Sequence, residues 1–144
     1  MQEALRHVPG PVAAVMVIDP ELAPDAHPLR GLDAFVIREP DGSLRRRIYV
    51  NARSPMMRAA LNGSRLSLAV LAAVLHHEMQ HLQGRSESQA RAAERDLFAR
   101  LMDQGVVARH EGLTFLEQFD RQPPPPAHDL APGESGAPGP PRTP

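Results

Sequence analysis

The sequence of 144 residues contains no cysteine, no lysine and no tryptophan, and aromatic residues make up 3% of it. The absence of cysteine excludes disulfides, cysteine-ligated zinc and thiol catalysis, so any metal must be bound by histidine and carboxylate side chains. Because aromatic residues are scarce, the hydrophobic core must consist of Leu, Val, Ala and Met. With 42% hydrophobic residues the chain can still form one compact domain.

Long apolar runs and a strong net charge are also missing. The longest apolar stretches, about Val12–Ile18 and Leu66–Leu75, are far shorter than the roughly 18 residues that a membrane span requires. The formal net charge is −1, so nothing indicates nucleic acid or a membrane as a partner. The N-terminus lacks the charged and apolar regions of a signal peptide, and a cytoplasmic localisation is therefore expected.

The first half of the chain carries the signals of a small sheet. Val12–Ile18 is apolar throughout and lies between a Gly-Pro and an Asp-Pro pair, which predicts a buried strand. A Pro-Asp-Gly turn separates Ala34–Glu39 from Leu44–Asn51, which predicts a β-hairpin. The three arginines Arg45–Arg47 predict that the second hairpin strand lies at an edge of the sheet, because charges discourage pairing between sheets.

Helices are expected to follow, two of them joined by a sharp turn. A short helix should span Ser54–Leu61, and a long helix should begin at Ser64 or Ser67 and end near Gly84. A second long helix should occupy Ser86–Gln104, since its first residues have the spacing of a capping box.

These elements predict an α+β fold with one domain at residues 1–121. A small, mostly antiparallel sheet would pack on the first long helix, and the second, Glu-bearing helix would pack on the other side. Val106–Phe119 would add a strand and a short helix. Residues 122–144 are rich in proline and should form a disordered tail.

The first long helix carries a candidate metal site in the segment HEMQH, from His77 to His81. Residues four apart on a helix point the same way, so both imidazoles can reach one cation. Glu78 lies about 100° further round the helix, beside the metal rather than bound to it. There its carboxylate can accept a proton from water that the metal activates.

A carboxylate of the second long helix can complete the set of ligands. If the chain folds back at Gly84, Glu87 lies opposite His81, whereas Glu94 falls almost two turns deeper. We therefore favour Glu87 as the third ligand, and Glu94 is the alternative ligand or a hydrogen-bond acceptor for a ligand histidine. His110 follows this helix and could return to the site to stabilise an oxyanion, although a surface histidine is the simpler interpretation.

The segment His77–Glu87, HEMQHLQGRSE, resembles the zincin metallopeptidases, which share the HExxH motif. Its spacing is similar to the metzincin pattern HExxHxxGxxH/D, while a glutamate ligand on a following helix is typical of gluzincins. The chain therefore looks like a minimal gluzincin-like domain. The resemblance implies one Zn²⁺ ion bound by His77, His81 and Glu87, and peptide-bond hydrolysis with Glu78 as the general base.

The expected partner is a peptide or protein substrate. It would bind by strand addition along the expected edge strand, about Arg46–Asn51. The alternative is a non-catalytic zinc-binding domain that acts in regulation or protein interaction. Glu78 argues against this alternative, because a purely structural zinc site does not need a general base.

Overall fold

The computed structural model describes residues 1–22, 31–39 and 41–122. This part of the chain contains five helices and three strands, which confirms the α+β class. The tail expected at residues 122–144 lies, from residue 123 onward, outside the described residues. In chain order the elements are α1 (Gln2–Arg6), β1 (Ala14–Ile18), β2 (Ala34–Arg38), β3 (Leu44–Asn51), α2 (Pro55–Leu61), α3 (Arg65–Leu82), α4 (Glu87–Asp103) and α5 (Arg109–Arg121).

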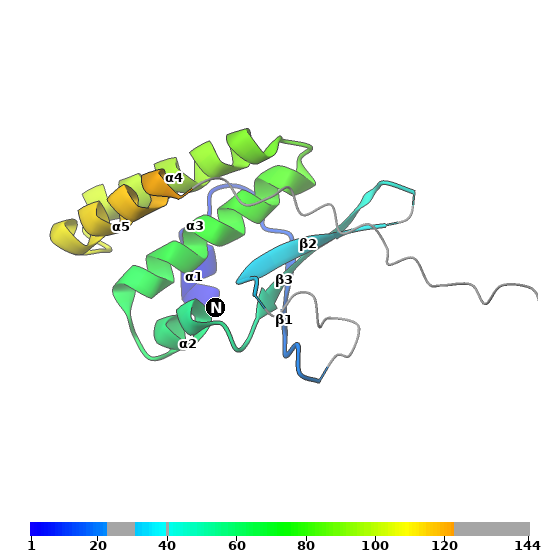
Figure 1. The fold of residues 1–144 in the computed structure, drawn as a ribbon, viewed down its shortest axis with the longest axis horizontal. Coiled ribbons are helices and arrows are strands. Elements are labelled where there is room, and N and C mark those ends of the chain that lie inside the picture. The colour runs from blue at the N-terminus through cyan, green and yellow to red at the C-terminus, as the bar shows by residue number, and fades with distance from the viewer. Residues whose placement is uncertain (23–30, 40, 123–144) are drawn as a thin grey trace, which may run out of the picture.

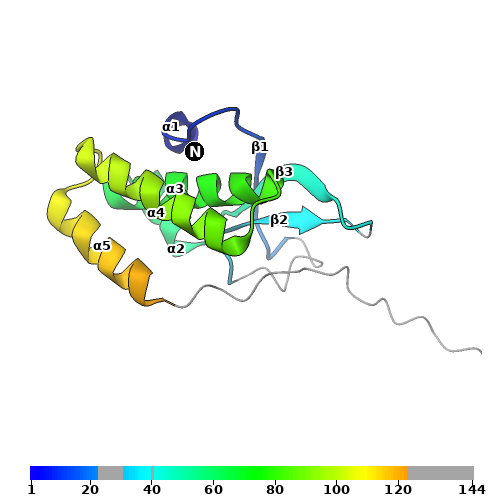
Figure 2. The same ribbon diagram turned by 90° about the horizontal axis from the view of Figure 1, so that it is seen from above.

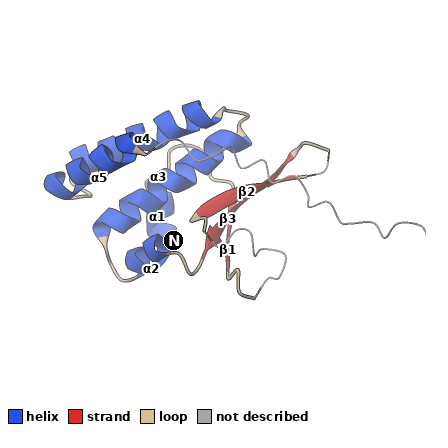
Figure 3. Ribbon diagram, viewed as in Figure 1, coloured by secondary structure: helices blue, strands red, loops and turns tan. Residues whose placement is uncertain are grey.

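Helix α3 is the centre of the fold (Figures 1 and 2). It packs on one face of the sheet, and α4 covers its other side, with α5 packed against α4. Figure 3 shows the strands gathered on one side of the molecule and the helices on the other. The core is aliphatic, as the composition requires, and its fully buried side chains include Ile48, Val50, Leu71, Leu75, Phe98 and Leu101.

The sheet is mixed rather than mostly antiparallel. Its strand order is β1-β3-β2, with β1 parallel and β2 antiparallel to β3. The expectation that Arg46–Asn51 forms an edge strand is therefore wrong, because β3 is central. The reason is local: β1 pairs only with Arg47–Asn51. Leu44–Arg46 extends past the end of β1 at the hairpin tip, so the arginines there do not guard an edge.

The expectation of a buried first strand is also wrong. β1 is an edge strand, and Met16 and Val17 are 40% and 47% exposed. An uninterrupted apolar run is typical of strands that are covered on both faces, and it does not report the position of a strand within its sheet. The burial of β1 is decided by its neighbours in space, which a short segment does not encode.

The local signals around the long helices are confirmed. Ser64 caps α3 by accepting a hydrogen bond from the backbone N–H of Ser67. Ser86 and Gln89 form the expected capping box at the start of α4. Gly84 has φ +78°, a left-handed conformation that glycine adopts without strain. The turn between α3 and α4 is therefore fixed by residues on both sides of it.

The segment after α4 differs from its prediction. Val106–Phe119 was expected to form a strand and a short helix, but α5 is one helix and contains no strand. Gly112 lies inside this helix, and a Cβ atom there would come within 2.6 Å of Sδ of Met102. The glycine that weakens the helical signal thus lets α5 approach the end of α4 closely.

No helix in the described part of the chain combines the length and the apolar character that crossing a membrane requires.

Candidate metal centre

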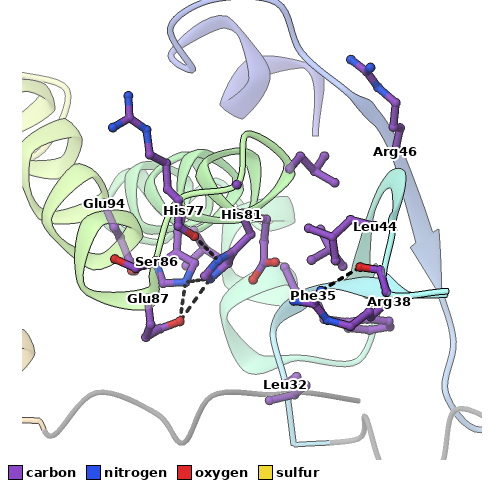
Figure 4. Close-up of a pocket in the computed structure, with 18 residues that line it drawn as sticks. Leu32, Phe35, Arg38, Leu44, Arg46, His77, His81, Ser86, Glu87 and Glu94 are labelled. Carbon is purple, nitrogen blue, oxygen red and sulfur yellow. Dashed lines mark hydrogen bonds and ion pairs between the residues drawn. The ribbon is translucent and has the colours of Figure 1, made fainter. Parts of the chain in front are cut away.

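The end of α3 and the start of α4 bring the three candidate ligands together (Figure 4). His77 and His81 lie on the last turns of α3, and Glu87 is the first residue of α4. The turn at Gly84 and the cap at Ser86 reverse the chain between them. The fold-back at Gly84 therefore places Glu87 opposite His81, as the sequence argument expected.

The hydrogen bonds of the two imidazoles determine which ring nitrogen carries a proton. Nδ1 of His77 lies 2.9 Å from Oε2 of Glu94, and Nδ1 of His81 lies 3.3 Å from the carbonyl oxygen of Arg85. Both partners are hydrogen-bond acceptors, so both Nδ1 atoms donate. In their neutral forms the two rings therefore direct the lone pairs of Nε2 towards the site.

Three acceptor atoms consequently converge on one point. Nε2 of His81 lies 3.0 Å from Nε2 of His77 and 3.1 Å from Oε2 of Glu87, and the last two atoms are 3.6 Å apart. Lone pairs at these distances repel one another unless a cation lies among them. Ligand atoms about 2.05 Å from a tetrahedral zinc ion are about 3.3 Å apart. The observed separations fit such an ion, and the fourth position stays open.

Glu87 provides a second indication. Its other carboxylate oxygen, Oε1, is buried and has no hydrogen-bond partner among the described residues. An unpaired buried carboxylate oxygen is costly, and a cation offsets that cost. The His77, His81 and Glu87 side chains thus have the donor set, the separations and the unsatisfied charge of a group that could hold a metal.

Glu94 supports this group from its outer side. Its carboxylate accepts the Nδ1 hydrogen of His77, and both side chains are nearly buried, so the interaction is little screened by water. Burial lowers the pKa of His77, but the hydrogen bond and the charge of Glu94, together with Glu78 and Glu87, outweigh it and raise the pKa. A proton therefore competes with a metal for this ring.

Glu78 has the environment of a general base. It is 9% exposed and lines the same cleft as the three candidate ligands. Burial raises the pKa of Glu78 to about 7, and the charges of Glu87 and Glu94 act in the same direction. His77 and a hydrogen bond from the backbone N–H of Val36 act against the rise. A carboxylate that titrates near neutrality is suited to accepting and returning a proton.

The neighbouring His76 points to a different environment. It is buried, and its Nδ1 has no hydrogen-bond partner among the described residues. Burial lowers the pKa of His76, and the charges of Arg100 and His77 lower it further. Its ring is therefore neutral near pH 7 and does not line the cleft.

The cleft has a volume of about 840 Å³ and lies between the β2–β3 hairpin and the ends of α3 and α4. Leu32, Ala34, Phe35 and Val36 form its wall on the side of β2. In the described residues β2 pairs only with β3, so its other edge is open towards the site. The strand edge beside the candidate centre therefore belongs to β2 and not to Arg46–Asn51.

His110 does not join the site. It is exposed on the first turn of α5, and α5 begins after the C-terminal end of α4. Glu87 lies at the opposite end of α4, which is about 25 Å long at 1.5 Å per residue. The expected role of His110 as an oxyanion stabiliser is therefore wrong, and the surface interpretation agrees with the structure.

Comparison with known proteins gives no assignment. No family model, no curated protein and no solved structure matches the chain. The function must therefore be argued from the geometry of the candidate centre itself.

Proposed function

We propose that this chain is a zinc-dependent peptidase of zincin-like type. The single observation that carries the proposal is the convergence of Nε2 of His77, Nε2 of His81 and Oε2 of Glu87 within 3.6 Å of one another. Glu78 beside this group supports a catalytic rather than a structural site. A site that only stabilises the fold does not need a buried carboxylate in an open cleft.

His77, His81 and Glu87 would hold the zinc ion, and Glu94 would orient His77 through the hydrogen bond to Nδ1. A zinc ion supplies Lewis acidity, which lowers the pKa of water to about 7. Three protein ligands leave one position open, as catalytic zinc sites require.

Glu78 would transfer the proton. Its ionised carboxylate takes a proton from the attacking water and then gives it to the amine that leaves from the peptide bond. Its burial supports this role, because burial raises the pKa towards the working pH. The backbone N–H of Val36 donates to the same carboxylate, which orients it from the side of the strand.

The substrate would be a peptide or protein segment in extended conformation. The open edge of β2 is adjacent to the site and forms part of the cleft wall. An extended peptide can pair with such an edge through backbone hydrogen bonds. This assigns to β2 the substrate-binding role that the sequence suggested for Arg46–Asn51.

The proposal is tested by zinc content and by hydrolysis. Protein purified without chelators should contain about one zinc per chain, because three ligands converge on one site. Incubation with a mixed peptide pool should yield cleavage products, and a chelator should abolish them. Zinc binding without any cleavage would favour a non-catalytic regulatory or interaction domain, and a chain that binds no zinc would refute both functions.

A further inference from the structure

The cleft extends from the candidate metal centre to a second, cationic region. Arg38 and Arg46 line it at the tip of the β2–β3 hairpin, and Arg85 lines it from the turn after α3. Figure 4 shows Arg38 and Arg46 on the hairpin side of the cleft, across from Glu87 and Glu94. The acidic side chains of the cleft are thus grouped at its metal end.

The alternation of β3 explains why Arg46 belongs to the cleft. Ile48 and Val50 are fully buried in the core that α3 forms with the sheet. Side chains two residues apart on a strand point to the same face, so Arg46 lies on the face that α3 covers. Arg45 and Arg47 lie on the opposite face. Because the hairpin extends past β1, Arg46 reaches the cleft while remaining exposed.

Other arginines of the chain have carboxylate partners. Arg45 pairs with Glu39 at 2.6 Å, Arg53 with Asp19 at 2.7 Å and Arg95 with Asp120 at 2.9 Å.

Arg46 and Arg85 differ from these arginines. Within the described residues, neither forms a salt bridge to a carboxylate. Arg38 donates a hydrogen bond to the carbonyl oxygen of Gly42 at 2.8 Å, which holds its guanidinium at the hairpin tip.

The charges of the cleft favour an anionic ligand. Three arginines and three glutamates line it, so their formal charges cancel. A divalent cation at the candidate centre adds two positive charges among the glutamates. The arginine region is then left without compensation, and a cleft wall of low dielectric strengthens its field.

We propose that Arg46 and Arg85 form a cationic subsite that selects peptides with an aspartate or glutamate near the bond to be cleaved. This inference rests on the proposed peptidase function and deepens it by naming the substrate class. The apolar wall of the cleft, which includes Val36 and Leu44, separates the subsite from the metal centre. The acidic side chain of the substrate therefore lies beside the reacting bond and not at the metal.

The test compares two matched fluorescent peptides that differ only by Glu or Gln beside the same peptide bond. The wild-type chain should cleave the Glu peptide with a higher kcat/KM than the Gln peptide. Arg46→Gln and Arg85→Gln should each reduce this preference roughly threefold, and the double variant about tenfold, as expected for partly exposed charge pairs. Raising the salt concentration should weaken the preference in the wild type.

Arg47→Gln is the matched control, because Arg47 lies on the same strand but on the opposite face and does not line the cleft. It should leave the preference unchanged. An equal effect of Arg46→Gln and Arg47→Gln would show that overall charge, and not a subsite, attracts the peptide.

A binding measurement separates the subsite from catalysis. Fluorescence anisotropy of the same two peptides is measured on the full-length Glu78→Gln chain, with and without added zinc. Cleavage without a preference for Glu overturns the subsite and leaves the peptidase function intact. Preferential binding of the Glu peptide without cleavage by the wild type overturns the peptidase function and supports the subsite. Equal binding and no cleavage overturn both.

Discussion

Replacing Glu94 tests how the carboxylate behind His77 contributes to metal binding. The Glu94 carboxylate accepts the Nδ1 hydrogen of His77 at 2.9 Å, and the two side chains are 12% and 11% exposed. Water therefore screens this charged hydrogen bond only weakly, and Glu94→Ala removes both its charge and its orienting effect. Losing such a partner typically weakens metal affinity 10- to 100-fold, about 1.4–2.7 kcal/mol.

The variants should form an ordered series. Glu94→Gln keeps an oxygen that accepts the Nδ1 hydrogen and should therefore weaken zinc binding less than Glu94→Ala. Glu87→Ala removes a proposed ligand and should weaken it more than either. Asp96→Ala is the control, since Asp96 is an exposed carboxylate on the same helix that does not line the cleft.

Competition against a zinc chelator of known affinity gives all four dissociation constants, and circular dichroism verifies that each variant is folded. If Glu94→Ala releases zinc more readily than Glu87→Ala, Glu94 is the ligand. The assignment of Nδ1 and Nε2 of His77 would then be reversed, and the reasoning from the hydrogen bonds would be refuted.

Three further predictions address the base, the turn and the core. Glu78 must be ionised to accept a proton, so kcat/KM should fall as the pH decreases through its pKa; a bound cation stabilises the carboxylate, and the acidic limb of the pH profile should lie at or below about 7 rather than above it. Gly84→Ala should weaken zinc binding in the chelator assay and lower stability by about 1 kcal/mol, because φ +78° is strained for alanine. Phe98→Ala should cost about 3–5 kcal/mol in urea unfolding, since its side chain is fully buried; a cost below 1 kcal/mol would contradict the packing of α4.

The helical part of the candidate centre was predictable because its signals are local. His77 and His81 share a helix face by their spacing, and Gly84 and Ser86 mark the end of one helix and the start of the next. The position of Glu87 follows from these four residues through the fold-back at the turn. None of these steps needed knowledge of residues far away in the sequence.

The sheet was less predictable because strand order depends on distant pairing. The arginines of β3 were taken as a sign of an edge, but β1 pairs only with Arg47–Asn51 and leaves Arg46 beyond its end. The apolar run at Val12–Ile18 likewise does not reveal that β1 has a neighbour on one side only. The site was affected through this error, because the open edge beside it belongs to β2.

The wall of the cleft was not predicted for the same reason. The hydrogen bond from Val36 to Glu78 and the approach of Arg46 join the hairpin to α3, which lies far along the chain. The tendency of Arg46 to face the cleft follows from alternation only once Ile48 and Val50 are known to pack on α3.

The central claim is tested most directly by the peptidase activity of zinc-loaded wild-type protein beside Glu78→Gln protein prepared in the same way. The account predicts that both chains bind about one zinc ion, that the wild type cleaves a mixed peptide pool, and that Glu78→Gln does not. A chelator should stop cleavage by the wild type, and added zinc should restore it. Cleavage by Glu78→Gln at the wild-type rate, or the absence of cleavage by a wild-type chain that holds its zinc, would contradict the account.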